Sequence, residues 1–421
     1  MAESNPRSLI GAVLNVRMLL CVLCGFSSGM PLYVLVQLVP AWLRASEVDL
    51  ATIGLMSMVS FPYTWKFLWS PTMDRIVPPI LGRRRGWALI TQVCLFVVIA
   101  SLGAFDPADH MGWIAAFVGA IALFSASQDI VLDAYRRELL PDHELGIGNA
   151  MFVNAYRLSS LVPGSLALIL ADQMPWSTIH PIVAAFMGIG VLTSLLMPEP
   201  VDQGLAPKSM AEAVVKPFTA FVEAHGVRGT LLVLGFMLLY KLGDSMATAL
   251  LTPFYLDVGF SMTQIGTVVK AASLWSAIAG GVAGGLIMVK LGINRALWVF
   301  GVVQLVSILG FALLSEVGAH SGVLFVVVSF EYLGVGLGTA AFVAFIARST
   351  DKRYTATQLA LLTSLTGIPR TFANASTGYI IEWIGYTGFF LGCTVIAIPG
   401  MLMLPFVAPW GPDPVSKEEP S

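Results

Sequence analysis

The sequence is poor in charged residues: Asp, Glu, Lys and Arg make up 11% of its 421 residues, whereas 57% are hydrophobic. A soluble domain is nearer a quarter charged, because its surface must face water. The deficit excludes a soluble globular protein and predicts an integral membrane protein. The formal net charge of -2 also excludes a broad positive field of the kind that attracts nucleic acid.

Cysteine and histidine are scarce as well, and neither is spaced like a metal site. The four cysteines, Cys21, Cys24, Cys94 and Cys393, lie in apolar runs, where we expect them to pack as small hydrophobic side chains. The five histidines fall in predicted loops or at helix ends. Polar segments are too short to hold a catalytic domain. The sequence therefore predicts no metal, no cofactor and no enzyme.

Long apolar runs fill the rest of the chain and predict an all-α membrane protein. A spanning helix needs about 20 mostly apolar residues to cross about 30 Å of hydrocarbon. The runs that satisfy this length predict twelve spans, at 18–43, 51–71, 87–105, 112–136, 147–171, 178–197, 229–256, 262–289, 295–315, 321–347, 355–381 and 385–408. The first run is too long for the apolar core of a signal peptide, and no small-residue cleavage site follows it.

Basic residues in the short loops predict the orientation. Most of them fall on the same side as the N-terminus, including Arg83, Arg84, Arg136 and Arg348, and Arg44 falls on the other side. Cytoplasmic loops carry an excess of Lys and Arg, so we expect both termini to be cytoplasmic. The break at 200–227 divides the spans into bundles at 1–199 and 228–421. Such a linker is typical of transporters whose halves are parallel repeats.

Ionisable residues lie deep inside the predicted spans, where they cost several kcal/mol unless they are paired or used. They are Lys66, Asp129, Asp133, Arg157, Lys241, Asp244, Lys270, Glu331 and Arg370. Helices joined by a short loop descend about 1.5 Å per residue on either side, so reflection through the loop compares depths. It places Asp129 level with Arg157, and it places Glu331 and Arg370, and likewise Asp244 and Lys270, within about one turn of each other. Three acid and base pairs could therefore form at matched depths.

Two interpretations of these charges stay open. Static ion pairs can lock helices together, and this reading is favoured for Asp133 and Lys66 near the cytoplasmic ends. Ionisable residues deep inside both halves instead favour solute transport. Cations slightly outnumber acids among them, which suits an anionic solute. A carboxylate whose cation is drawn to the substrate would take up a proton. We assign this proton coupling first to Asp129 and Glu331.

Further polar and aromatic side chains could bind the solute beside these charges. A sugar-binding wall could use Gln37, Tyr63, Gln128 and Tyr156, although rings in spanning helices are more often packed or face lipid. Together with the cations, the predicted substrate-binding residues are Lys66, Gln128, Arg157, Lys241, Lys270, Arg370, Gln37, Tyr63 and Tyr156.

Seven motifs make the chain resemble the AmpG-type muropeptide permeases of the major facilitator superfamily. They are GFSSGMP at 25–31, KFLWSPTMDR at 66–75, GRRRGW at 82–87, SASQDIVLDAYRRELL at 125–140, YRL at 156–158, GTAAFVAF at 338–345 and TATQLALL at 355–362. The resemblance implies a major-facilitator-type fold of twelve transmembrane helices in two six-helix bundles.

The resemblance also implies a function. Members of the family import N-acetylglucosaminyl-anhydro-N-acetylmuramyl peptides across the bacterial inner membrane with proton coupling, for peptidoglycan recycling, with a link to beta-lactamase induction. The matching family-motif positions are Gly29, Ala126, Gln128, Asp129, Asp133 and Arg157. The resemblance further implies a cytoplasmic gate at Asp74, Arg75, Arg83 and Arg84.

Two departures from the family pattern stand out. Six residues, 76–81, separate Arg75 from Gly82, so the contacts of this gate need not follow the superfamily loop D-R-x-G-R-R. Some relatives extend beyond twelve spans, and we expect this chain to work without such an extension.

Other functions stay open at this point. They are a carrier of another anionic metabolite such as an acyl-CoA or a sugar, a membrane-embedded transferase, and a receptor. A muropeptide and the lipid bilayer are the expected partners, and the sequence does not indicate an oligomeric state.

Overall fold

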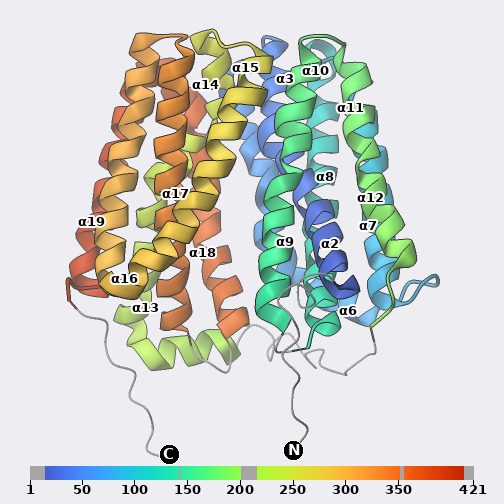
Figure 1. Ribbon diagram of the computed structural model, residues 1–421, viewed down its shortest axis with the longest axis horizontal. Helices are drawn as coiled ribbons and strands as arrows, with labels where there is room; N and C mark the ends of the chain where they lie inside the picture. Colours follow the sequence, from blue (N-terminus) through green and yellow to red (C-terminus); the bar gives the residue numbers. More distant parts are fainter. Residues whose placement is uncertain (1–14, 142–143, 201–215, 351–354, 412–421) are drawn as a thin grey trace, which may run out of the picture. The chain divides into compact units, whose positions relative to one another are not determined.

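The computed structural model describes residues 15–141, 144–200, 216–350 and 355–411, and every regular element in them is helical (Figure 1). The prediction of an all-α membrane protein is confirmed. The chain divides into two compact units. The first comprises 1–48, 59–207 and 261–266, and the second comprises 49–58, 208–260 and 267–421. Within the predicted linker, the helix α13 already begins at Lys216. The bundle boundaries 1–199 and 228–421 stay predictions.

Nine helices among the described residues are long and apolar enough to cross a membrane. One of them, Met262–Val317, has 56 residues. At 1.5 Å per residue this is far longer than a bilayer is thick. It is broken at Gly292, where φ is 75° and ψ is 166°, and Figure 1 shows the chain reversing there. This helix therefore supplies two spans. The total of twelve is consistent with the structure and stays a prediction.

The first unit begins with one long, irregular span. It comprises α2 (Val16–Tyr33), a π-helix (Val34–Leu38) and α3 (Val39–Ala45). Gly25, Gly29 and Pro31 lie within this span. The α-helix runs through this stretch and widens into the π-helix three residues after Pro31.

The predicted span 51–71 is a chain of short helical pieces instead of one helix. They are α4 (Leu50–Leu55), 3₁₀ turns at Met56–Ser60 and Lys66–Leu68, α5 (Phe61–Trp65) and α6 (Ser70–Arg75). Pro62 and Pro71 each stand in the first turn of a new piece. Proline has no N–H to donate to the preceding turn, so each one starts a helix rather than continuing it.

Regular helices complete the first unit. They are α7 (Arg83–Leu102), α8 (Pro107–Leu139), α9 (Leu145–Ser159), α10 (Ala167–Ala171), α11 (Trp176–Ala185), α12 (Met187–Leu196) and the short α15 (Met262–Gln264). Helices α2 and α9 cross closely at glycine: a Cβ on Gly25 would lie 2.3 Å from the carbonyl oxygen of Phe152. Cys21 and Cys24 are free, buried and packed in the core of this unit, as predicted.

The second unit is built from longer helices. They are α13 (Lys216–Ala249), α14 (Leu251–Val258), α16 (Lys270–Val317), α17 (Ser321–Ser349), α18 (Thr355–Ala375) and α19 (Thr377–Val407), with α4 packed against them. Positive φ angles at Gly226 and Gly385 break α13 and α19. Aromatic rings fill the core, where Tyr240 stacks on Phe342 at 5.8 Å.

The glycine run of α16 allows close contact with α17. A Cβ on Gly280 would lie 2.3 Å from the carbonyl oxygen of Leu333. Its neighbour Gly281 has no atom within 4 Å of such a Cβ. The two glycines therefore differ in packing although they are adjacent in sequence.

We expect Gly280→Ala to destabilise the protein and Gly281→Ala to leave it unchanged. Overpacking a tight contact costs about 1–3 kcal/mol, which should lower the unfolding temperature of the detergent-purified protein. Gly281→Ala is the matched control, since it makes the same substitution one residue away in the same helix. Equal unfolding temperatures for the two variants would contradict the helix contact described here.

Candidate functional site

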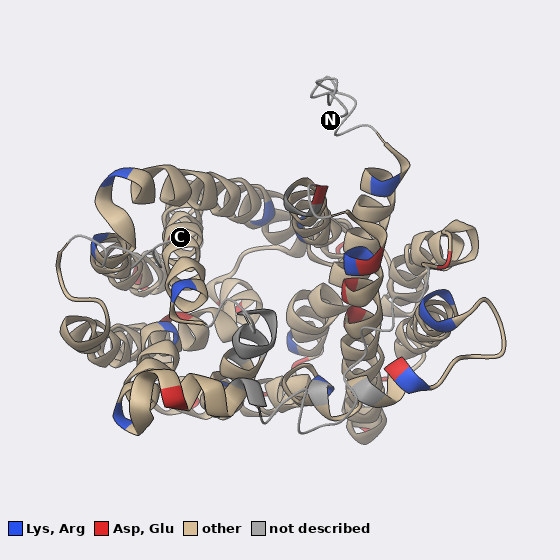
Figure 2. Cartoon of the chain, turned by 90° about the horizontal axis from the view of Figure 1, so that it is seen from below, with Lys and Arg blue, Asp and Glu red and all other residues tan. Residues whose placement is uncertain are grey.

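Charged residues are sparse along the helices of both units (Figure 2). Three clusters contain most of the predicted site residues: one around Asp129 and one around Arg84 in the first unit, and one around Glu331 in the second. Ion pairs and hydrogen bonds hold each cluster together. No group of three or more metal-ligating side chains occurs in the part of the chain that the structure describes.

Asp129 is the centre of the first cluster. Helix α8 carries it inward, and its side chain is only 13% exposed. The Ser28 hydroxyl donates a 2.5 Å hydrogen bond to Oδ1, and the Lys66 Nζ lies 3.9 Å from Oδ2. Lys66 follows directly on the short helix α5 and is 34% exposed. Because the lysine is accessible and its contact is loose, this ion pair can open at low cost.

Polar and aromatic side chains surround this ion pair. The Tyr63 hydroxyl donates to Ser125 Oγ at 2.7 Å, and the Tyr156 ring meets the Tyr33 ring edge to face with centroids 5.8 Å apart. Gln128 is fully buried, and neither atom of its amide has a protein partner among the described residues. The tyrosines and Gln128 predicted from sequence thus lie on the elements that carry Asp129 and its neighbours.

The predicted pairing of Asp129 with Arg157 is wrong, because Lys66 takes that place. Arg157 is half-buried on α9 and forms no ion pair within the described residues, although it acts electrostatically on Tyr33. Reflection through a loop gives the depth of a residue but not the face of the helix on which it lies. Asp129 faces Lys66 and Ser28, and depth alone could not reveal this.

Lys241, Asp244 and Glu331 form the second cluster. Lys241 Nζ lies 3.4 Å from Asp244 Oδ2 and 3.5 Å from the Thr339 hydroxyl. Glu331 is 1% exposed on α17, and Ser307 donates a 2.5 Å hydrogen bond to its Oε2. This cluster joins α13, α16 and α17 within the second unit.

Two further predicted pairs are also wrong. Glu331 was expected to pair with Arg370, and it bonds to Ser307 instead. Arg370 is half-buried on α18 and acts electrostatically on Asp244. Asp244 was expected to pair with Lys270, and it pairs with Lys241, three residues earlier on its own helix. Lys270 is buried at the first position of α16.

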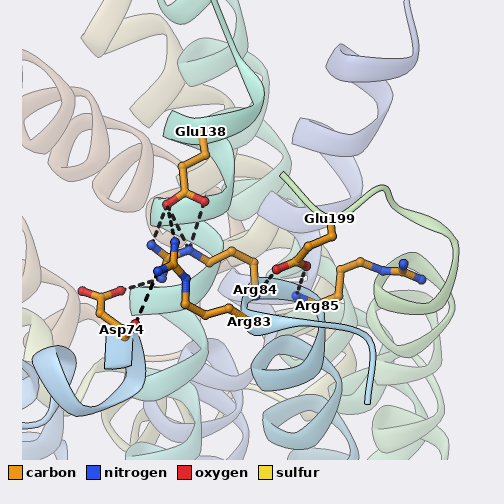
Figure 3. Close-up of polar contacts among 6 residues, drawn as sticks. All are labelled: Asp74, Arg83, Arg84, Arg85, Glu138 and Glu199. Carbon is orange, nitrogen blue, oxygen red and sulfur yellow. Dashed lines mark hydrogen bonds and ion pairs between the residues drawn. The ribbon is translucent and has the colours of Figure 1, made fainter. Parts of the chain in front are cut away.

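Arg84 is the centre of the third cluster (Figure 3). Its guanidinium lies 2.6 Å from Asp74 Oδ1 and 2.6 Å from Glu138 Oε1, so it joins α6, α7 and α8. Arg83 adds a looser contact of 3.8 Å to Glu138. The six-residue insertion before Gly82 therefore does not prevent the contact between Asp74 and Arg84. Arg75, also predicted at this gate, is exposed.

Glu199 completes this cluster from the end of the first unit. Its carboxylate oxygens accept hydrogen bonds from the backbone N–H groups of Arg84 and Arg85 at 2.8 and 2.9 Å (Figure 3). The first N–H groups of a helix have no partner within the helix, and its N-terminus favours negative charge. Glu199 thereby caps α7.

The remaining predicted residues lie apart from these contacts. Gly29 is a packing position, where a Cβ would lie 2.5 Å from the Tyr156 carbonyl oxygen, and Ala126 is fully buried. Asp133 is 50% exposed and pairs with Arg136 at 2.9 Å. Gln37 is half-buried on the π-helix of the first span. In the TATQLALL motif, the side chains of residues 355–360 lie outside the described residues.

Sequence reasoning missed Ser28, Ser307, Glu138 and Glu199. The serines gave no signal, since serine is common in apolar helices. The two acids lie at predicted helix ends, where charge is ordinary. A search for acids close to the basic run 83–85 could have suggested Glu138.

Comparisons with known proteins agree on one family. The sequence model of the Major Facilitator Superfamily matches residues 21–373. A protein of Haemophilus influenzae without an assigned function is 47% identical over 96% of this chain and 97% of its own. The anhydromuropeptide permease of Escherichia coli K12 is 41% identical over 92% of this chain and 79% of its own.

Solved structures show the same fold at low sequence identity. A nucleoside transporter matches 93% of this chain and 99% of its own with a TM-score of 0.73 and 12% identity. A D-xylose–proton symporter matches 96% of this chain and 99% of its own with the same TM-score and identity. The fold is therefore that of the superfamily.

We expect Arg84→Met to destabilise the protein strongly. It removes the buried cation that lies 2.6 Å from both Asp74 and Glu138, and only the looser contact of Arg83 to Glu138 at 3.8 Å remains. Breaking a buried ion pair costs about 3–5 kcal/mol. Thermal unfolding in detergent measures the loss. Arg85→Met is the matched control, since among the described residues the Arg85 side chain donates only to the carbonyl groups of Ser194 and Leu195. Adding Glu138→Gln to Arg84→Met should recover part of the loss, and an unchanged unfolding temperature in Arg84→Met would contradict this account.

Proposed function

The chain belongs to the Major Facilitator Superfamily and, within it, to the AmpG-type permeases, and on this premise we propose that it imports anhydromuropeptides in symport with protons. It is a multi-pass membrane transporter. The proposed substrates are N-acetylglucosaminyl-anhydro-N-acetylmuramyl peptides, carried from periplasm to cytoplasm. The observation that carries the proposal is the accessible Lys66–Asp129 ion pair in a chain 41% identical to a relative named an anhydromuropeptide permease.

The chemistry of the substrate suits the side chains around Asp129. A muropeptide presents carboxylates, amides and sugar hydroxyls. Lys66 supplies the cation for a carboxylate, and Gln128 supplies both a donor and an acceptor that have no protein partner among the described residues. Tyr63 and Tyr156 offer ring faces and hydroxyls to the sugar. We assign substrate binding in this unit to these four residues and to Arg157.

Proton coupling follows from competition for Lys66. When a substrate carboxylate draws the Lys66 ammonium away, Asp129 loses the cation that favours its ionised form. A buried carboxylate without a cation is costly, so Asp129 takes up a proton. Ser28 can remain hydrogen-bonded to the neutral carboxyl group. Substrate entry and proton entry are thereby linked at one carboxyl group.

The second unit is proposed to contribute in the same way. Lys241, Lys270 and Arg370 supply cations, and Glu331 supplies a second acid for coupling. An anionic solute needs an exposed or half-buried cation to bind. Arg370 is half-buried, lies near Asp244, and forms no ion pair within the described residues.

The cellular setting follows from the family and from the loop charges. We place the protein in the bacterial inner membrane with both termini in the cytoplasm, because basic residues concentrate in the loops on the side of the N-terminus. Import would return cell-wall fragments for peptidoglycan recycling. A link to beta-lactamase induction remains an expectation from the resemblance.

A carrier of another anionic solute is the second candidate. The cations Lys66, Arg157 and Lys241 would also suit an acyl-CoA or an acidic sugar. Competition distinguishes the two, since an excess of such a solute would block uptake of labelled anhydromuropeptide only if both used the same site.

We expect Asp129→Asn to abolish proton-driven accumulation of labelled anhydromuropeptide in proteoliposomes. The asparagine cannot take up a proton, so an imposed pH gradient no longer drives uptake, whereas exchange of internal for external substrate continues. Asp133→Asn is the matched control: Asp133 lies one turn along the same helix, is 50% exposed, and among the described residues forms an ion pair only with Arg136. Accumulation by Asp129→Asn at the wild-type level would refute the role of this carboxyl group.

We expect Lys66→Gln to weaken substrate binding about tenfold or more. A hydrogen bond to a charged group contributes about 1.5–3 kcal/mol, and the glutamine retains only a neutral donor. The measurement is the KM for uptake, with Lys66→Arg as the variant that keeps the charge and restores part of the affinity. A muropeptide whose carboxylates are amidated should lose this dependence on Lys66. If amidated and free substrates respond equally to Lys66→Gln, the lysine does not bind a carboxylate.

A further inference from the structure

Two carboxyl groups face each other inside the second unit. Asp244 comes from α13 and Glu331 from α17, and the two carboxyl groups interact electrostatically with each other. Lys241 joins the same two helices, because its Nζ lies 3.4 Å from Asp244 and 3.5 Å from Thr339 of α17. Glu331 is 1% exposed, and the Asp244 side chain is 14% exposed. This contact between two acids was not among the pairs predicted from sequence.

One oxygen of each carboxyl group has a hydrogen-bond donor or a cation, and the other oxygen has neither in the described part of the chain. Glu331 Oε2 accepts from Ser307, and Asp244 Oδ2 is contacted by Lys241 Nζ. The other oxygen of each group, Glu331 Oε1 and Asp244 Oδ1, is buried and has no protein donor among the described residues. An ionised carboxylate only accepts hydrogen bonds, whereas a protonated one also donates. One proton between the groups would satisfy both oxygens.

The charges around the pair also favour one proton. Lys241 offers one positive charge at 3.4 Å, which balances one carboxylate. Arg370 acts on Asp244 from α18 and forms no ion pair among the described residues, and Tyr240 and Tyr255 lie close enough to interact with Asp244 and Glu331, respectively. If both acids were ionised, two like charges would adjoin in apolar surroundings, which is unfavourable.

We propose that Asp244 and Glu331 share one proton and together form the proton-binding site of the second unit. The proton then belongs to the pair, not to either residue alone. Lys241 would control its release: a substrate anion that draws Lys241 from Asp244 strengthens the hold on the proton, and return of Lys241 weakens it. This use in transport depends on the proposed function, whereas the shared proton itself does not.

A competing arrangement would keep both acids ionised. Asp244 lines a small hollow together with Tyr240, Gln304 and apolar residues. A water molecule in that hollow could donate to Asp244 Oδ1 without any extra proton. An experiment must therefore detect the protonated carboxyl group directly.

The test is infrared spectroscopy of the purified wild-type protein in liposomes without substrate. A protonated carboxyl group has a C=O stretching band that a carboxylate lacks. We expect this band near neutral pH, its shift in deuterated water, and its loss in both Asp244→Asn and Glu331→Gln. Glu316→Gln is the control, because Glu316 is exposed on the same unit and accepts only from Thr387 among the described residues.

A second measurement, the pH dependence of wild-type stability, tests the proposal even if the substituted proteins fold poorly. The folded pair holds a proton that the unfolded chain releases, so wild-type stability should fall as pH rises through the range where the band disappears. Asp244→Asn should flatten this dependence, because the asparagine donates to Glu331 at every pH.

Each result decides the question. Absence of the band in the wild type, or its persistence in either variant, overturns the shared proton, and loss in Glu331→Gln alone assigns the proton to Glu331. If the band behaves as expected but anhydromuropeptide is not transported, the proposed function fails and the proton site stands.

Discussion

A charge inside the membrane is costly without a partner, and this constraint determines where several ionisable side chains of this protein lie. Asp129 has Lys66 and Ser28, Glu331 has Ser307, and Arg84 has two acids. The helices that carry these groups are mostly apolar, so each contact fixes the rotation of one helix against another. The same contacts that make the charges tolerable therefore define the packing of each unit.

The contacts differ in tightness, and in the proposed function this difference separates contacts that hold helices together from the contact that takes part in transport. Arg84 holds Asp74 and Glu138 at 2.6 Å with little exposure, as expected for a joint between helices that must stay together. Lys66 and Asp129 are 3.9 Å apart, and the lysine is a third exposed. A loose pair of this kind can exchange its partner for a substrate anion. We interpret the Arg84 contacts as structural and the Lys66–Asp129 ion pair as the contact that takes part in substrate binding.

Much of the fold could be predicted from the sequence, because apolar length and basic loops report directly on spans. The long helices α8, α13 and α17 fall where the apolar runs lie, and the prolines explain why 51–71 is fragmented. Pairings could not be predicted in the same way. Depth along a helix follows from residue number, whereas the face that Asp129 or Glu331 presents depends on tertiary packing. Ser28 and Ser307 gave no warning, since a hydroxyl among apolar residues looks ordinary until its partner is known.

Gly292 has a consequence for how the protein is made. It turns the chain between the two spans of α16 at a φ of 75° and a ψ of 166°, a conformation essentially restricted to glycine. The translocon therefore has almost no loop to hold between these spans, and they should leave it together as a helical hairpin. Replacing Gly292 by a residue with a side chain would therefore impair membrane insertion. It would reduce the amount of protein in the membrane and not the transport rate of each molecule.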